Sequence, residues 1–116
     1  MADAKLLAIA LILAGEALAI YAEMLGAKAY AESSPFLAAF LKMLLVMTVG
    51  GGFLIAGYML GFQAFQNIWI VTAASITSIL IIEPILAYTL FQQLPTKGAM
   101  VGLALGLAGF LAALFF

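Results

Sequence analysis

The chain has 116 residues, of which 68% are hydrophobic and 8% are charged, and its mean hydropathy is +1.31. This composition is typical of an all-α integral membrane protein and lies far outside the range of soluble globular domains. His, Cys and Arg are absent, which excludes disulfides, His/Cys metal sites, a cysteine nucleophile and a Ser-His-Asp triad. The net charge of −1 provides no basic patch for nucleic acid. We therefore expect no enzymatic activity, no metal and no cofactor.

The first membrane-length stretch, residues 6–26, contains two carboxylates. A helix of about 20 apolar residues spans a bilayer core, and a Glu at its centre is costly unless it is neutral, paired or hydrated. Glu16 occupies that central position, and Glu23 lies two helical turns farther along the same face. Glu16 is therefore the strongest candidate for a proton-binding or substrate-binding group. The alternative is that Glu16 is a protonated, hydrogen-bonded structural residue and that Glu23 simply reaches the membrane interface.

The second span, residues 36–62, follows a polar loop in which Ser33 or Ser34 is expected to cap the helix. Three consecutive glycines near its middle remove side chains from the whole circumference of the helix. Such a run allows either a hinge or the close approach of another backbone. The glycines are Gly50, Gly51 and Gly52, and the pattern alone leaves both roles open.

The third span, residues 68–90, begins with Trp69, where an interfacial aromatic residue is expected. Its second half contains Glu83 and Pro84. Because proline removes the helical hydrogen bond to the Leu80 carbonyl, this third carboxylate lies beside a bend or hinge. The first half is rich in small hydroxylated residues that pack closely or form hydrogen bonds between helices, namely Thr72, Ser75, Thr77 and Ser78.

The fourth span, residues 97–116, carries a stripe of glycines that favours close helix association. Its members are Gly98, Gly102, Gly106 and Gly109. We expect this stripe to lie at a helix–helix interface between two protomers. Together the four spans form one transmembrane domain, residues 1–116, with both chain ends on the same side.

The last third of the chain resembles the last two helices of a repeat in the drug/metabolite transporter superfamily. The matching features are Pro84, the interfacial turn Leu94-Pro95-Thr96 and the glycines of the final span. The overall plan of four helices with a Glu in the middle of the first resembles the small multidrug resistance branch, and implies a bundle of that type. In this resemblance Glu16 corresponds to the carboxylate that binds protons and substrate. Trp69 corresponds to a third-helix Trp that helps to line the pocket.

The resemblance implies a small proton-coupled exporter of cationic or polar small molecules in the cell inner or plasma membrane. Such a protein works as a homodimer, or as a heterodimer with a paralogous small subunit, surrounded by membrane lipid. In each protomer Glu16 binds either protons or substrate, so protonation expels the substrate during alternating access. Tyr21, Glu23, Glu83 and Trp69 are the further candidate substrate- or proton-binding residues.

Two other functions remain open. Glu23 and Glu83 are additional to the drug-exporter pattern, which favours a divergent member such as a subunit that flips undecaprenyl-phosphate sugars. The absence of Arg counts against that function, because a bidentate guanidinium is the best ligand for phosphate. The other possibility is an accessory subunit of a larger membrane complex, in which a partner chain neutralises Glu16 and Glu23, since Lys42 alone cannot neutralise three carboxylates.

Overall fold

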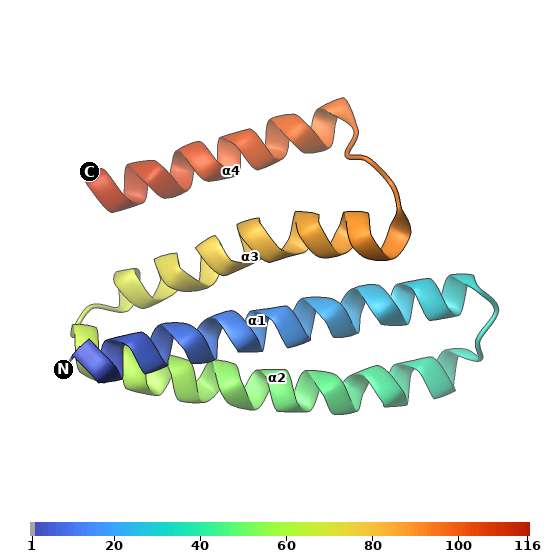
Figure 1. Cartoon of the computed structure of the whole chain (residues 1–116), viewed down its shortest axis with the longest axis horizontal. Helices are drawn as coiled ribbons and strands as arrows, with labels where there is room; N and C mark the ends of the chain where they lie inside the picture. Colours follow the sequence, from blue (N-terminus) through green and yellow to red (C-terminus); the bar gives the residue numbers. More distant parts are fainter. Residues whose placement is uncertain (1) are drawn as a thin grey trace.

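The structure is a computed structural model that describes residues 2–116, apart from the side chains of Ala2 and Leu114. It contains the four expected helices, labelled in Figure 1. Their bounds are α1 (Ala2–Ala31), α2 (Phe36–Phe65), α3 (Ile68–Phe91) and α4 (Lys97–Phe115). The first helix is longer at both ends than the apolar stretch that predicts it. Both ends of the chain lie at the same end of the molecule, as expected.

Glutamines in the left-handed conformation end two of the helices. Gln66 follows α2 with φ 57°, and Gln92 follows α3 with φ 56°. The backbone N–H of each donates to the carbonyl four residues earlier, on Phe62 and Tyr88 respectively. Each side-chain amide also donates to a carbonyl three residues earlier, at 2.7 Å for Gln66 and 3.0 Å for Gln92. These bonds satisfy carbonyl groups that a helix end leaves without partners.

Side chains cap the starts of α3 and α4, but not that of α2. The Asn67 side chain accepts from the backbone N–H of Trp69, and the Thr96 hydroxyl accepts from that of Ala99. For α2, the expected serine cap is wrong: Pro35 occupies the cap position and no side chain caps the helix. Ser33 and Ser34 instead complete the last turn of α1, because their backbone N–H groups donate to carbonyls of that helix.

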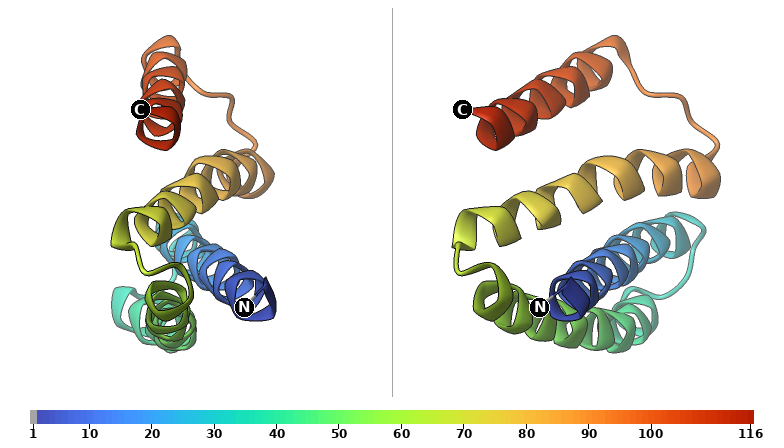
Figure 2. Two further views of the ribbon diagram at one scale, coloured as in Figure 1. Left: turned by 90° about the vertical axis from the view of Figure 1, so that its left-hand side faces the viewer. Right: turned by 60° about the vertical axis from the view of Figure 1, so that its left-hand side comes forward.

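The four helices lie in a row in the order α2, α1, α3, α4, and α2 also contacts α3 (Figures 1 and 2). The Cα atoms extend over 47 × 34 × 16 Å, so the row is one layer of helices, wider than it is thick. Three steps of about 8–10 Å between neighbouring axes account for most of the intermediate dimension. Among the described residues, α4 packs against α3 alone. Within one chain, the fourth helix is therefore attached along a single side.

The contact between α1 and α2 depends on glycines that let the backbones approach. A Cβ added at Gly57 would lie 2.7 Å from the Ile12 side chain and 3.3 Å from the Ala8 carbonyl oxygen. A Cβ at Gly50 would lie 3.1 Å from the Gly15 carbonyl oxygen. Small residues at such positions increase the van der Waals contact that holds helices together in lipid. The α1–α2 pair is thus the most closely packed part of the chain.

Little of the apolar side-chain surface is buried between the helices. The buried apolar residues are few and mostly small, and Ile12 and Val71 are the largest that are fully buried. Leucine, isoleucine and phenylalanine side chains remain exposed along all four helices. Three helices, α1 to α3, are long and apolar enough to cross a membrane. α4 has 19 residues, which corresponds to a length of about 28 Å.

The contact of Gly57 with α1 predicts that a methyl group added to α2 has different effects at different positions. Gly57→Ala should lower the free energy of unfolding by about 1–3 kcal/mol, because the new Cβ overlaps Ile12. Gly52→Ala is the matched control, since nothing lies within 4 Å of its added Cβ. The measurement is unfolding in mixed micelles with increasing denaturing detergent, followed by circular dichroism. Equal losses in the two variants would contradict the packing described here.

Candidate functional site

Glu16 and Ser75 form the one side-chain hydrogen bond between helices in the part of the chain that the structure describes. The Ser75 hydroxyl on α3 donates to Oε1 of Glu16 on α1, with an oxygen–oxygen distance of 2.8 Å. Ser75 is buried, with 7% of its surface exposed, and Glu16 is half-buried. Glu16 lies at the midpoint of α1, far from either end of that helix. We call these two residues the Glu16–Ser75 pair.

The bond made by Ser75 differs from those of the other hydroxyls in α2 and α3. Thr77 donates to the Ala73 carbonyl and Ser78 to the Ala74 carbonyl, four residues earlier in the same helix. Thr48 and Thr89 do the same in their own helices. Such internal bonds are the usual solution for Ser and Thr in apolar helices. Ser75 instead donates to a carboxylate, which makes a charge-assisted bond when Glu16 is ionised.

The second carboxylate oxygen of Glu16 is left for another partner. Ser75 donates to Oε1. Among the described residues, no side-chain oxygen is both buried and without a hydrogen-bond partner. Oε2 therefore keeps accessible surface beside the contact of α1 with α3. Oε2 can therefore accept a further hydrogen bond.

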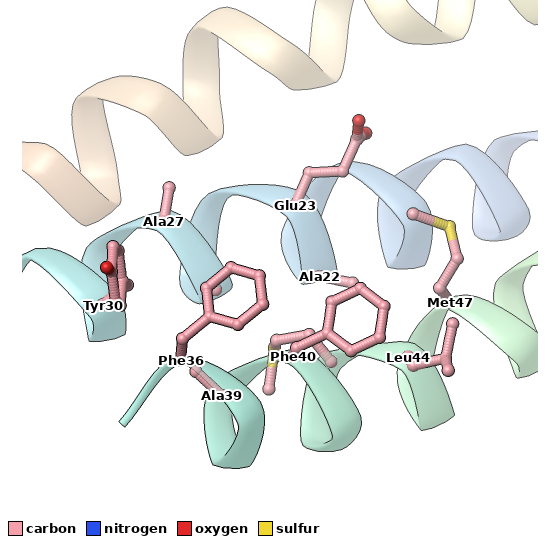
Figure 3. A pocket seen from close by; sticks show the side chains of 11 residues that line it. Ala22, Glu23, Ala27, Tyr30, Phe36, Ala39, Phe40, Leu44 and Met47 are labelled. Atoms are coloured by element: carbon pink, nitrogen blue, oxygen red, sulfur yellow. The ribbon is translucent and has the colours of Figure 1, made fainter. Parts of the chain in front are cut away.

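Glu23 and Tyr21 lie elsewhere on α1. Glu23 is exposed and borders a groove of about 320 Å³ between α1 and α2, whose walls include Phe36, Phe40 and Met47. Figure 3 shows the Glu23 carboxylate pointing away from both phenyl rings. Tyr21 is exposed and forms no part of that groove. The structure therefore joins neither residue to the Glu16–Ser75 pair.

Glu83 lines a separate groove of about 630 Å³ between α3 and the start of α4, which we call the Glu83 groove. Pro84 and Gly102 also line it, so it combines three of the positions expected from the sequence. α3 continues as a helix through Pro84 to Phe91. Among the described residues, no cluster of three or more His, Cys, Asp or Glu side chains can hold a metal ion.

Trp69 is 76% exposed. It borders a third groove, of about 680 Å³, together with Gly106 and Gly109 of α4. Within one chain, the tryptophan and the carboxylate that the resemblance places in one pocket are thus on different surfaces.

Most of the expected glycine positions remain open. Nothing lies within 4 Å of a Cβ added at Gly102 or Gly109, and Gly98 meets only the hydroxyl of its own cap residue, Thr96. Gly106 is the exception, with Leu80 of α3 at 3.3 Å. In the triplet of α2, Gly50 is buried against α1, whereas Gly51 and Gly52 contact nothing and α2 stays helical through all three.

Glu16 stands out in the sequence, but its hydrogen-bond partner does not. Ser75 is one of several small hydroxylated residues, with nothing in its own chemistry to separate it from Thr72 or Thr77. What distinguishes Ser75 is its place on one face of α3. Val71, Ser75 and Ser78 share that face and are the buried residues of this helix among those described. That i, i+4, i+7 spacing defines the face of α3 that packs on α1 and α2.

Comparison with protein-family models, with curated proteins and with solved structures finds no match for this chain. Its function must therefore be inferred from the position and chemistry of the polar side chains within the apolar helices.

The Glu16–Ser75 pair predicts different effects for two buried serines. Ser75→Ala removes the donor to the carboxylate and should lower the free energy of unfolding by about 0.5–1.5 kcal/mol. Ser78→Ala should cost less, because Ser78 donates only within its own helix. Unfolding in mixed micelles measures both. A double-mutant cycle with Glu16→Leu, which removes the acceptor, should show coupling for Ser75 and none for Ser78. Coupling with neither serine would remove the pair as an interaction between helices.

Proposed function

We propose that this protein is a small membrane transporter that exchanges protons for a cationic or polar small molecule at Glu16. One observation carries the proposal. A half-buried carboxylate in the middle of a long apolar helix has a neutral hydroxyl as its hydrogen-bond partner and one oxygen still accessible. Ionisable groups at such depth are costly and are typically functional. The arrangement suits a group that alternates between a proton and a substrate.

The Ser75 hydroxyl supports both states of Glu16. When Glu16 is ionised, Ser75 donates a charge-assisted hydrogen bond to Oε1 and holds the carboxylate against α3. A cationic substrate then interacts with the remaining negative charge. When Glu16 takes up a proton, the charge is lost and the bond from Ser75 weakens to that of a neutral pair. Proton and cation therefore compete for one carboxylate, which is the basis of exchange.

The packing of the helices supports a movement of α3 and α4 relative to α1 and α2. The α1–α2 contact is close and depends on backbone approach at Gly50 and Gly57. The α3–α4 contact is loose, with grooves along it. The Glu16–Ser75 pair joins the two halves, so its strength depends on what Glu16 has bound. A change at Glu16 can in this way bias a conformational equilibrium, as alternating access requires.

A homodimer completes this proposal. A single row of helices one layer thick leaves one side of Glu16 uncovered, and a second row placed against it would cover that side. α4 packs on one neighbour only, and most of its glycine stripe is open. The size of the chain, its four helices and the resemblance through Glu16 and Pro84 further support a member of the drug/metabolite transporter superfamily in the cell membrane. Because one chain is a single layer of helices, we expect it to contribute one half of a binding site that a second chain completes.

The role of Glu16 predicts a loss of proton release without a loss of folding. Glu16→Gln keeps the size and polarity of the side chain but cannot ionise, so substrate addition to reconstituted protein should release no protons above background. Glu83→Gln is the matched control and should keep most of the release. A pH-sensitive dye measures release while candidate cations are added. Release by Glu16→Gln equal to that of the unaltered protein would end the proposal and leave Glu16 as a structural residue.

The dimer predicts a specific effect of bulk on α4. Gly109→Leu adds a side chain where no atom of the same chain lies within 4 Å of the new Cβ, so it should weaken association while the chain still folds. The loss should be a few kcal/mol at most. Gly52→Leu on α2 is the control with equal space. Native mass spectrometry in mild detergent measures the fraction of dimer. A complex with a larger, different subunit would instead indicate an accessory role.

A further inference from the structure

The Glu83 groove has no part in the exchange proposed at Glu16. It is formed by the second half of α3, the first turns of α4 and the loop between them. Its volume of about 630 Å³ lies within the range of small-molecule sites. Its polar lining comes from Glu83, Tyr88, Gln93 and Thr96, and the rest is apolar. A site that combines a carboxylate with apolar walls selects for charge as well as shape.

Glu83 is the one charged side chain among the described residues that line this groove, and Tyr88, Gln93 and Thr96 can each accept as well as donate a hydrogen bond. Within the described residues, the Glu83 carboxylate is joined to no other side chain by a hydrogen bond. Pro84 has no N–H, so the Leu80 carbonyl lacks its usual helical donor on the part of α3 that lines the groove. Lys97 is close in sequence but does not line the groove. The site is therefore suited to a cation that donates several hydrogen bonds.

The apolar walls require the same ligand to carry a hydrocarbon part. Leu80, Phe91 and Leu103 line the groove beside Glu83, and Met24 of α1 also contributes to its lining. A primary ammonium has three N–H donors and matches the acceptors, whereas a quaternary ammonium has none. An anion would meet the carboxylate with like charge. The chemistry of the lining thus distinguishes among three classes of amphiphile.

We propose that the Glu83 groove is a second binding site, for an amphiphile with a primary ammonium group. The ammonium binds the Glu83 carboxylate, and the alkyl chain lies against Leu80, Phe91 and Leu103. Two sources share this chemistry, namely a soluble alkylamine and a lipid with an ethanolamine headgroup. The proposal does not depend on the function of Glu16.

Native mass spectrometry in nonionic detergent tests this site with dodecylammonium as the probe. The titration uses the full chain carrying Glu16→Gln, so that a cation bound at Glu16 does not add to the count. We expect one saturable adduct per chain. Adding Glu83→Gln should weaken it about tenfold or more, because a charge-assisted bond is lost. Adding Glu23→Gln, the matched control, should leave it unchanged.

Two chemical controls and one further variant sharpen the test. Dodecyltrimethylammonium and dodecyl sulfate have the same chain, and both should bind at least about tenfold more weakly. Gly102→Leu should also abolish the adduct, because it fills the groove from a position with no atom within 4 Å of the new Cβ. Adducts are counted separately on monomer and dimer, so an effect of Gly102→Leu on association is not mistaken for one on binding.

Three results would overturn the site. These are an adduct that survives both Glu83→Gln and Gly102→Leu, equal binding of all three amphiphiles, and a dimer that excludes the amine because a second copy fills the groove. Competition by phosphatidylethanolamine, but not by phosphatidylcholine, would identify the lipid as the source. No competition by either would identify a soluble amine. Proton release measured on Glu83→Gln reports separately on the function proposed for Glu16.

Discussion

The close approach of α1 and α2 determines the direction in which Glu16 points. Gly15 and Gly50 bring the two backbones together, so the face of α1 that carries Ala8, Ile12, Gly15 and Ala19 is fixed against α2. Successive residues of a helix are about 100° apart, which turns position 16 toward α3. A side chain larger than hydrogen at position 15 would separate the helices and alter that orientation. The hydrogen bond between Glu16 and Ser75 of α3 thus depends on the contact that Gly15 makes with α2.

The chain has two halves of different character. The backbones of α1 and α2 approach closely at Gly15, Gly50 and Gly57, and one groove opens between these helices beside Glu23. Two larger grooves follow the seam of α3 with α4. Leu103 and Phe110 are the half-buried residues of α4 among those described, and they lie on its side facing α3. Because dispersion contacts and not water drive helix packing in lipid, a seam with few contacts is one that can move or be replaced. α4 is the helix whose surroundings a second chain would change most.

The three carboxylates of the apolar helices lie in three different environments. Glu16 is between α1 and α3 with a serine donor, Glu23 is at the edge of an apolar groove, and Glu83 is in a groove with several acceptors. One chain therefore does not gather them into a single acidic cluster. Substitutions at the three positions are therefore expected to have separable effects.

The sequence alone determined the number of helices, their approximate positions and the place of Glu16 in the middle of the first one. These follow from local quantities, because the length of an apolar run and the cost of a charge within it do not depend on the neighbouring helices. The exact ends of the helices were harder to predict from the sequence. Ser33 and Ser34 have the composition of a cap for the next helix, yet their N–H groups complete the previous one.

Only the tertiary structure decided which residues meet. The sequence does not distinguish Gly50 from Gly51 and Gly52. In the structure, Gly50 lies on the side of α2 that packs against α1, and the other two glycines lie on open sides of the helix. The same holds for Ser75 among the hydroxyls of α3 and for Trp69, which the row of helices places on a different surface from Glu16. In a chain this apolar, every face of every helix is hydrophobic. The usual contrast between a buried and a polar face is therefore missing, and the choice of face comes from the fit of small residues against neighbouring backbones.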